Sequence, residues 1–376
     1  MNNKNKQRLS LLFNNYIKNF SLIEKEHRET YKWVAIEHFQ RHFNIDAENF
    51  PEMLREATAK TENLIDSTTQ PLYGMIFYAE QEPETVRNMF KALYAEDNGD
   101  LGVRQKKIDK FINDSEILRD KYAKDSWRYQ QNQRSVMSYL VFMFPEDNYM
   151  YKHSQAMEFA DCVDFFSDWG NGSNFKLNIY YKMCDELVAN IKENKELISK
   201  NKERYINSTQ PLYKDECLHI LAFDIIYCSQ RYGLYNGIEY QHTSSADKKE
   251  KLKEIEKALI VQEQFEKAEE NYKNLLKVKD AILSQFKTLS SVEHKTFGKG
   301  TILSVSENGV ASISFGDITK SFSLSIAIGV GSMKVGNEKL ENYIKDNFQI
   351  FKSESIIIST YQRLSKEMEK YIDLLQ

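Results

Sequence analysis

The spacing of apolar residues changes near residue 300, and this change limits the possible folds more than any other feature of the sequence. Apolar and polar residues alternate over 301–306 and again over 310–315, which is the two-residue spacing of β-strands. On both sides, over 246–290 and 338–376, apolar residues instead recur every three or four positions, as they do on amphipathic helices. We therefore expect a small all-β insert, residues 291–337, between two long helices.

Two turn signals divide this insert into three short strands. Asn308-Gly309 predicts a two-residue hairpin turn in which both residues have positive φ. Gly316-Asp317 marks a second turn, before a strand that ends near Leu324. Because three short strands bury only one small face, we expect the insert to close into an SH3-like barrel with help from flanking strands.

The two helical segments admit two arrangements. A helix over 247–289 would be about 65 Å long at 1.5 Å per residue. The returning helix, 338–376, could pair with it in an antiparallel coiled-coil hairpin that carries the barrel at its tip. Alternatively, both helices could lie flat on the N-terminal domain. The hairpin is favoured, and the same apolar faces could also join two copies of the chain into a homodimer.

Residues 1–235 are predicted to form a helical N-terminal domain. Trp33, Ile36, Phe39 and Phe43 follow one another at steps of three and four, which places them on roughly one helix face. The polar segment 233–245 contains glycine and marks the end of this domain. The expected fold class is therefore mainly α, with one small all-β insert.

The distribution of charge excludes a broadly basic DNA-binding domain. Residues 1–245 contain 31 Lys and Arg against 36 Asp and Glu, and the rest of the chain contains 20 against 19. A protein that holds duplex DNA mainly through its phosphates normally has a clear excess of positive charge. DNA binding would therefore need a local patch or pocket, and a protein partner is an equal alternative.

Several functional classes have no support in the sequence. The four cysteines lack metal-ligand spacing, and no apolar run approaches the roughly 20 residues that span a bilayer. No catalytic motif is present, and Gly298-Lys299-Gly300-Thr301 lacks the first glycine and the following helix of a P-loop. We therefore expect a cytoplasmic, non-enzymatic protein without cofactor, metal or membrane partner.

One group of residues could form a pocket for a nucleotide base. It combines aromatic, basic and amide side chains, the mixture that stacks on a base and reads its edge. Its members are Trp127, Arg128, Tyr129, Gln130, Arg134, Tyr149, Tyr151 and Lys152. The alternative, which is more common for such residues, is that the aromatic rings belong to the core and the charges are solvated.

The β insert resembles a known family. The segment VEHKTFGKGTI (292–302) follows the pattern V-x-H-x-x-F-G-x-G-x-[VI] that opens the C-terminal Tudor-like domain of UvrD/PcrA-type helicases. Lys320 fills the place of a lysine before the last strand. The resemblance implies a docking surface for RNA polymerase, a helicase or another partner, with His294, Phe297, Lys299 and Lys320 as its candidate residues. His294 and Phe297 are expected to pack at the end of the barrel rather than to do chemistry.

A second resemblance covers about 30–232. This region is similar to the N-terminal module that precedes the AAA motor in McrB-type restriction proteins. The similar positions are 31–40, 45–50, 53–57, 129–130, 135, 139–140, 145, 149, 151–152, 181, 184–186 and 224–227. The resemblance implies an element that selects modified or foreign DNA, or a partner. Because the chain has no motor of its own, any NTPase or nuclease would be a separate subunit.

Three functions remain open from the sequence. The first is a DNA-associated adaptor or recognition protein in restriction or phage defence, acting through a partner motor or nuclease. The second is a protein–protein scaffold that docks a partner through the Tudor-like barrel. The third is a nuclease whose site is not visible in one sequence.

Overall fold

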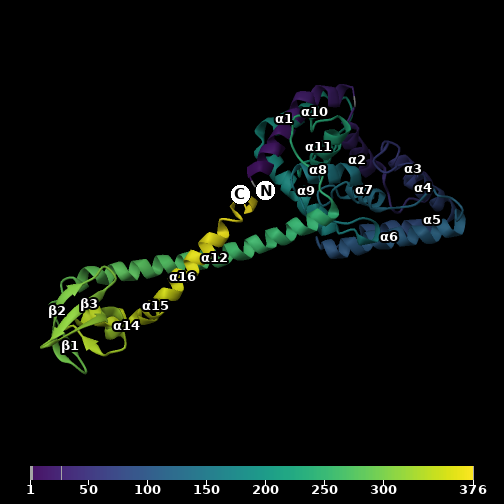
Figure 1. The fold of residues 1–376 in the computed structure, drawn as a ribbon. Helices are drawn as coiled ribbons and strands as arrows, with labels where there is room; N and C mark the ends of the chain where they lie inside the picture. The colour runs from purple at the N-terminus through teal and green to yellow at the C-terminus, as the bar shows by residue number, and fades with distance from the viewer. Residues whose placement is uncertain (1–2, 27, 376) are drawn as a thin grey trace. The chain divides into compact units, whose positions relative to one another are not determined.

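The structure is a computed structural model that describes residues 3–26 and 28–375 (Figure 1). Its contacts divide the chain into two compact units, residues 1–252 and 253–376. The division falls slightly after the segment 233–245 in which the sequence predicts the end of the N-terminal domain. Among the described residues, no helix is both long and apolar enough to cross a bilayer.

The first unit is helical throughout its regular structure. Its elements are α1 (Asn3–Lys25), α2 (Tyr31–His42), α3 (Phe50–Ala57), α4 (Pro71–Gln81), α5 (Pro83–Tyr94), α6 (Leu101–Tyr122), α7 (Gln133–Met143), α8 (His153–Cys162), η1 (Gly172–Asn174), α9 (Leu177–Glu193), α10 (Lys195–Asn207) and α11 (His219–Arg231). These helices enclose one continuous apolar core.

Local sequence signals explain several helix boundaries in this unit. Trp33, Ile36 and Phe39 are fully buried on α2, so the predicted apolar face is the face that packs. Pro83 is at the start of α5, where a backbone N–H would have no partner within the helix, so its absence in proline costs no hydrogen bond. Asn194 separates two helices, because it ends α9 and, as the N-cap of α10, accepts a hydrogen bond from Leu197 N.

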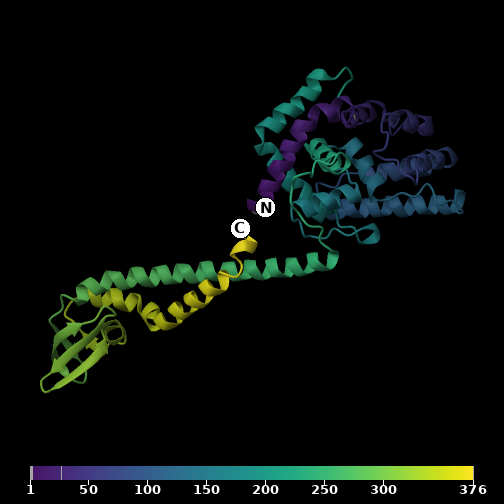
Figure 2. The same cartoon turned by 45° about the horizontal axis from the view of Figure 1, so that its top comes forward.

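The second unit contains most of the long helix α12 (Ser245–Phe286), whose existence confirms the sequence prediction. A five-stranded antiparallel sheet follows, and the switch to β-structure is also confirmed. Its strands are β1 (Ser291–His294), β2 (Gly298–Val305), β3 (Val310–Phe315), β4 (Ile318–Ser323) and β5 (Met333–Lys334), in the order β4-β3-β2-β1-β5. The sheet curls into a half-barrel, which is visible in Figure 2.

The turn between β2 and β3 differs from the prediction. Gly309 has φ +73°, but Asn308 is not among the described residues with positive φ. Gly309 N donates to Ser306 O over 3.0 Å, and Ser306 N donates to Val310 O over 2.9 Å. The connection is therefore a four-residue turn that ends in a left-handed glycine, a longer hairpin loop than the expected two-residue one.

The C-terminal segment also differs from the expected single returning helix. It forms α14 (Glu338–Asp346), α15 (Phe348–Lys352), α16 (Glu354–Met368) and α17 (Ile372–Leu375), and a short helix α13 (Leu324–Gly329) precedes it. Phe348 explains one interruption, because its ring lies against Gly329 so closely that a Cβ there would be 2.0 Å away. The ring is held by α13, and the chain turns at Asn347 to place it there.

Within the second unit α16 lies beside α12 (Figures 1 and 2). The ring of Tyr361 stacks on that of Tyr272, with centroids 4.4 Å apart and planes 7° from parallel. Lys279 and Glu354 form an ion pair between the same two helices. These contacts join the two helices, whereas a regular coiled coil between them stays a prediction.

Candidate functional site

A cavity of about 600 Å³ in the first unit is lined by three cationic side chains. Arg134 comes from the first turn of α7, Lys152 directly precedes α8, and Arg231 ends α11. Tyr151 and Tyr227 add aromatic rings, and several amide side chains complete the wall. Among the residues that the structure describes, no carboxylate lines this cavity, which we call the cationic pocket.

Arg134 is held in place by backbone carbonyl groups. Its Nη2 donates to the carbonyl oxygens of Asn63 and Asp66, the latter over 2.7 Å. Its Nε is buried and has no partner within the described part of the chain. Burial lowers the pKa of Arg134, which nevertheless stays charged at neutral pH. The guanidinium therefore has one donor that is buried beneath the pocket surface, and a ligand would bind Arg134 through its terminal nitrogens.

Lys152 is a buried cation that forms no ion pair with a carboxylate of the described residues. Lys152 is only 9% exposed, and its Nζ donates a hydrogen bond to Asn63 Oδ1 over 3.1 Å. Burial, which is the largest cause, and the positive charges of Arg134 and Lys32 together lower the pKa of Lys152 to about 7, although the Glu29 carboxylate acts in the opposite direction. An anion beside Nζ would favour the charged ammonium, so the pocket is suited to a negatively charged ligand.

The ring of Tyr227 links this pocket to a buried charge network. Lys152 Nζ lies 4.3 Å from the ring centroid and Lys32 Nζ lies 4.6 Å from it. Lys32 forms ion pairs with Glu29 and Asp224, and Arg204 binds Asp224 over 3.1 Å. This network is a fixed support behind the pocket, because its charges are paired and fully or nearly fully buried.

The structure brings only three of the eight predicted pocket residues to this cavity. These are Arg134, Tyr151 and Lys152. Tyr151 is fixed by its hydroxyl, which donates to His153 Nδ1 over 2.7 Å and accepts from Trp169 Nε1 over 3.0 Å. The ring is 5% exposed and packs against Phe175 and Tyr180 at centroid distances of 4.9 Å, so it belongs to the core beneath the pocket wall.

The other five lie elsewhere. Trp127, Arg128, Tyr129 and Gln130 belong to the loop between α6 and α7. Trp127 is 61% exposed, and the Arg128 guanidinium carbon lies 5.2 Å from its ring centroid. Tyr129 packs beside Gly74 of α4, so closely that a Cβ added at Gly74 would be 2.5 Å from the Cβ of Tyr129.

Tyr149 also faces away from the cavity. Its hydroxyl donates to Asp185 Oδ1 over 2.7 Å, and its ring lies 4.1 Å from that of His219. For Tyr149 and Tyr129 the structure therefore agrees with the alternative that the rings pack in the protein interior.

Sequence reasoning missed Asn63, Tyr227 and Arg231 as members of the pocket. Tyr227 falls within a segment that resembles the McrB-type module, so a signal was present, but no pattern indicated that it faces Lys152. Asn63 comes from the connection between α3 and α4, which has no motif. Only the folded chain shows that its amide and carbonyl groups contact Lys152 and Arg134 respectively.

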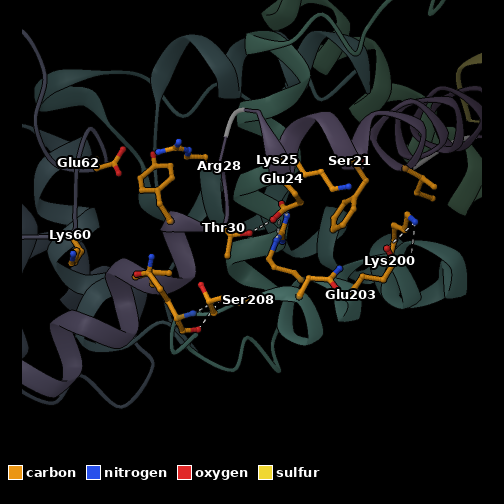
Figure 3. A pocket seen from close by; sticks show the side chains of 18 of the residues that line it. Ser21, Glu24, Lys25, Arg28, Thr30, Lys60, Glu62, Lys200, Glu203 and Ser208 are labelled. Carbon is orange, nitrogen blue, oxygen red and sulfur yellow. Dashed lines mark hydrogen bonds and ion pairs between the residues drawn. The ribbon is translucent and has the colours of Figure 1, made fainter.

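A second cavity in this unit, of about 830 Å³, has a different character (Figure 3). Basic groups such as Lys25, Arg28 and Lys60 alternate on its wall with Glu24, Glu62 and Glu203. Six basic side chains and three carboxylates line it, and two of these cations form ion pairs with two of these carboxylates, so part of its positive charge is already neutralised within the wall. The cationic pocket is the stronger candidate site.

The candidate docking residues of the β-sheet divide into buried and exposed ones. His294 is buried, and its Nδ1 accepts a hydrogen bond from Thr296 N over 3.0 Å. Its ring packs against Phe297 and Phe322 at centroid distances of 4.9 and 5.0 Å. Phe297 is 37% exposed, with Lys320 Nζ 5.6 Å from its ring centroid, and Lys299 is exposed. The packing role expected for His294 thus agrees with its surroundings.

Comparison of the chain with protein-family models, with curated proteins and with solved structures finds no match. The two resemblances stated for the sequence therefore stay predictions.

Proposed function

We propose that this protein is a non-enzymatic, DNA-associated recognition subunit that binds a phosphate-bearing nucleotide in the cationic pocket. The observation that supports this most is the combination of three cations, two tyrosine rings and no lining carboxylate in one cavity. Phosphate oxygens would bind Arg134, Lys152 and Arg231, and the amide side chains of the wall would face the polar edge of a base.

The size and composition of the pocket support a nucleotide rather than a long duplex surface. A volume of about 600 Å³ is within the range of roughly 300–1,000 Å³ that small-molecule sites occupy. The surrounding segment 1–245 has more acidic than basic residues, so it offers no broad phosphate track. A nucleotide that is unpaired, at a strand end or flipped from a duplex fits this arrangement best.

Fluorescence anisotropy on the full chain tests the proposal. Labelled single-stranded DNA, plain duplex and duplex with methylated cytosine would be titrated at one fixed salt concentration. Lys152→Met and Arg231→Gln should each weaken binding about tenfold or more, since each removes a charge-assisted contact. Lys182→Met is the matched control, because Lys182 is exposed on α9 and outside the pocket. Undiminished binding by both pocket variants would contradict the proposal.

In this proposal the protein acts through a separate motor or nuclease, as the McrB-like resemblance implies. Copurification with the products of neighbouring genes would identify such a subunit. The antiparallel coiled coil of α12 and α16, and a homodimer through these helices, belong to the same proposal. Light scattering on the full chain distinguishes a dimer from a monomer.

A scaffold function is the second candidate, favoured by apolar side chains exposed on the β-sheet. Leu303, Ile318 and Phe297 are all partly or largely exposed there. The Tudor-like resemblance implies RNA polymerase or a helicase as the partner. Pull-down of purified RNA polymerase by the wild type, lost in Phe297→Ser and kept in Lys182→Met, would support this function. No capture of polymerase or helicase by the wild type would remove it.

A further inference from the structure

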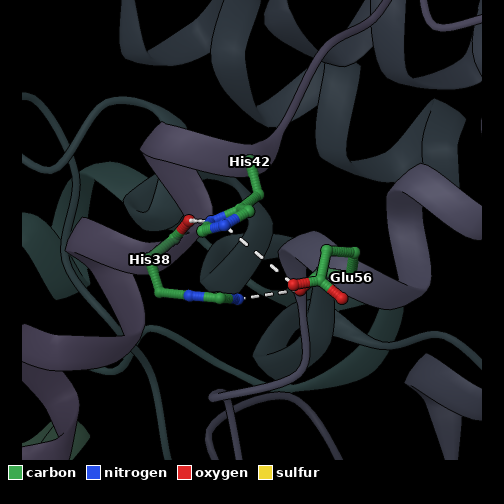
Figure 4. Close-up of side chains that lie close together, drawn as sticks. All are labelled: His38, His42 and Glu56. Carbon is green, nitrogen blue, oxygen red and sulfur yellow. Dashed lines mark hydrogen bonds and ion pairs between the residues drawn. The ribbon is translucent and has the colours of Figure 1, made fainter.

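Two histidines and a glutamate meet on the surface of the first unit, outside both cavities (Figure 4). His38 and His42 are one helical turn apart on α2, so their side chains lie on the same face. Glu56 comes from the last turn of α3, which packs against α2. Each of the three side chains offers one ligand atom, and these atoms lie within 4.8 Å of one another. His38 Nε2 donates to the backbone carbonyl oxygen of Glu56 over 2.9 Å, so His38 would bind a metal through Nδ1 or after this hydrogen bond is broken.

The hydrogen bonds of His42 prepare one nitrogen to bind a metal. Its Nδ1 lies 2.7 Å from the carbonyl oxygen of His38, and only a protonated Nδ1 can donate to that acceptor. The neutral ring then carries its lone pair on Nε2, which is 4.0 Å from Glu56 Oε1. A backbone carbonyl that fixes the tautomer of a ligand histidine in this way is a common feature of metal sites.

Glu56 is free to move into a ligand position. Among the described residues no Lys or Arg forms an ion pair with it, whereas Arg41 pairs with Glu37. Arg55, its neighbour, pairs with Glu52 and Glu80. The Glu56 side chain is 60% exposed, so a small rotation can shorten the 4.0 Å gap. Tetrahedral zinc ligands at about 2.0–2.1 Å from the metal are roughly 3.3 Å apart.

A second group of potential metal ligands in the same unit is already neutralised by cationic side chains, which would compete with a metal ion. Glu29, Asp224 and Cys228 also lie within 4.8 Å of one another. However, Lys32 and Arg204 already occupy their carboxylate oxygens and supply the positive charge. The surface group has no such internal cation, and it faces solvent from which an ion can enter.

We propose that His38, His42 and Glu56 bind a divalent transition metal, with Zn²⁺ as the ion that suits two imidazoles and one carboxylate best. Water would complete the coordination shell. Because the ligands come from two helices, the ion would join α2 to α3 and stabilise the first unit. This inference does not depend on the proposed function of the cationic pocket.

Calorimetric titration of the full chain with zinc chloride near pH 7.5 tests the site. The wild type should bind one ion, and His42→Ala and Glu56→Gln should each weaken that binding at least about tenfold, as loss of a ligand does. Glu52→Gln is the matched control, since this exposed carboxylate is on the same helix but pairs with Arg55. Zinc should also raise the Tm of the wild type and not that of His42→Ala.

Cobalt substitution separates this site from binding at cysteines. A Co²⁺ complex with two imidazoles and a carboxylate has visible bands without thiolate charge transfer. The proposal would be overturned by a strong thiolate charge-transfer band or by absence of binding in the wild type. It would also be overturned if His42→Ala and Glu56→Gln both bound the metal as tightly as the wild type. Circular dichroism of each variant confirms that a loss of binding is not a loss of folding.

Discussion

Lys32 and Lys152 both lie over the ring of Tyr227, yet their environments are opposite. Burial alone would lower the pKa of Lys32, but Asp224 and Glu29 outweigh burial and raise it. Lys152 is buried and forms no ion pair with a described carboxylate, and its pKa is lowered to about 7 although Glu29 acts to raise it. One ammonium group is therefore structural, and the other is available to a ligand.

Asp224 is the carboxylate on which the structural network depends. It is fully buried and binds both Lys32 and Arg204, and it accepts a hydrogen bond from Tyr16. Asp224→Asn should lower the free energy of unfolding by about 3–5 kcal/mol, because it leaves buried charges without a partner. Urea denaturation measures the change. Asp114→Asn, which removes the half-buried carboxylate that pairs with the exposed Lys110, is the control and should cost no more than about 0.5 kcal/mol.

The lowered pKa of Lys152 predicts how the stability depends on pH. The unfolded lysine has a pKa near 10.4, so between about pH 7 and pH 10 the unfolded chain binds more protons than the folded chain. Stability contributed by this group therefore rises with pH across that window. Lys152→Met should unfold with a higher free energy than the wild type at pH 7, by a few kcal/mol at most. The difference should shrink as the pH approaches 10.

Urea denaturation of both proteins at several pH values provides the measurement. Comparing the variant with the wild type cancels the groups that titrate in both. A difference that stays constant from pH 7 to pH 10 would show that the Lys152 ammonium is not destabilised by burial.

Helices and strands were predictable from the sequence where the apolar face that the local pattern indicates is also the face that packs on a core. The face of α2 and the alternation in β3 are visible in the sequence, because each stripe packs directly on a core. In β2 the alternation is interrupted, since the pairing register shifts between Ile302 and Ser304 and Leu303 is 59% exposed. The break between α9 and α10 and the interruptions after Asn347 and Ser353 were not predicted. The Asn194 cap overrides an otherwise continuous helical spacing at the first break, and the Phe348 ring beside Gly329 does so at the second.

Gly300 shows how closely the sheet elements pack. A Cβ at this position would be 2.5 Å from the ring of Phe315 and 2.7 Å from Ile313. Gly300→Val should therefore destabilise the second unit by about 1–3 kcal/mol, the usual cost of overpacking. Lys299→Val places the same side chain at the preceding, exposed position of β2 and is the control. Thermal unfolding of the full chain compares the two variants, and equal Tm values would show that the sheet can open at Gly300.

At the scale of the whole molecule, the sequence predicted the types of side chain in the candidate pocket better than it predicted which residues line it. Arg134, Tyr151 and Lys152 were selected because basic and aromatic residues near each other suit a nucleotide. Arg231 and Asn63 are far from them in the chain, and only the packing of α11 and the α3–α4 connection brings them to the same cavity. The spacing of residues along helices does not contain that information.

The distribution of charge over the chain gives the last prediction. Because residues 1–245 have an excess of acidic side chains, phosphate contacts should be confined to Arg134, Lys152 and Arg231. Binding to single-stranded DNA releases about 0.7 counterions per neutralised phosphate, so the slope of log K against log salt concentration should be about −2. Arg231→Gln should make the slope shallower by about 0.7, because one contact is lost.

Anisotropy titrations over a series of salt concentrations measure this slope. A slope of about −5 or steeper would mean that at least about seven phosphates are neutralised, more than the three cations of the pocket can contact. In that case DNA would lie along an extended surface, on a route that keeps its phosphates away from the acidic side chains of residues 1–245. A shallow slope that Arg231→Gln reduces further is the result expected of a single nucleotide held in one cavity.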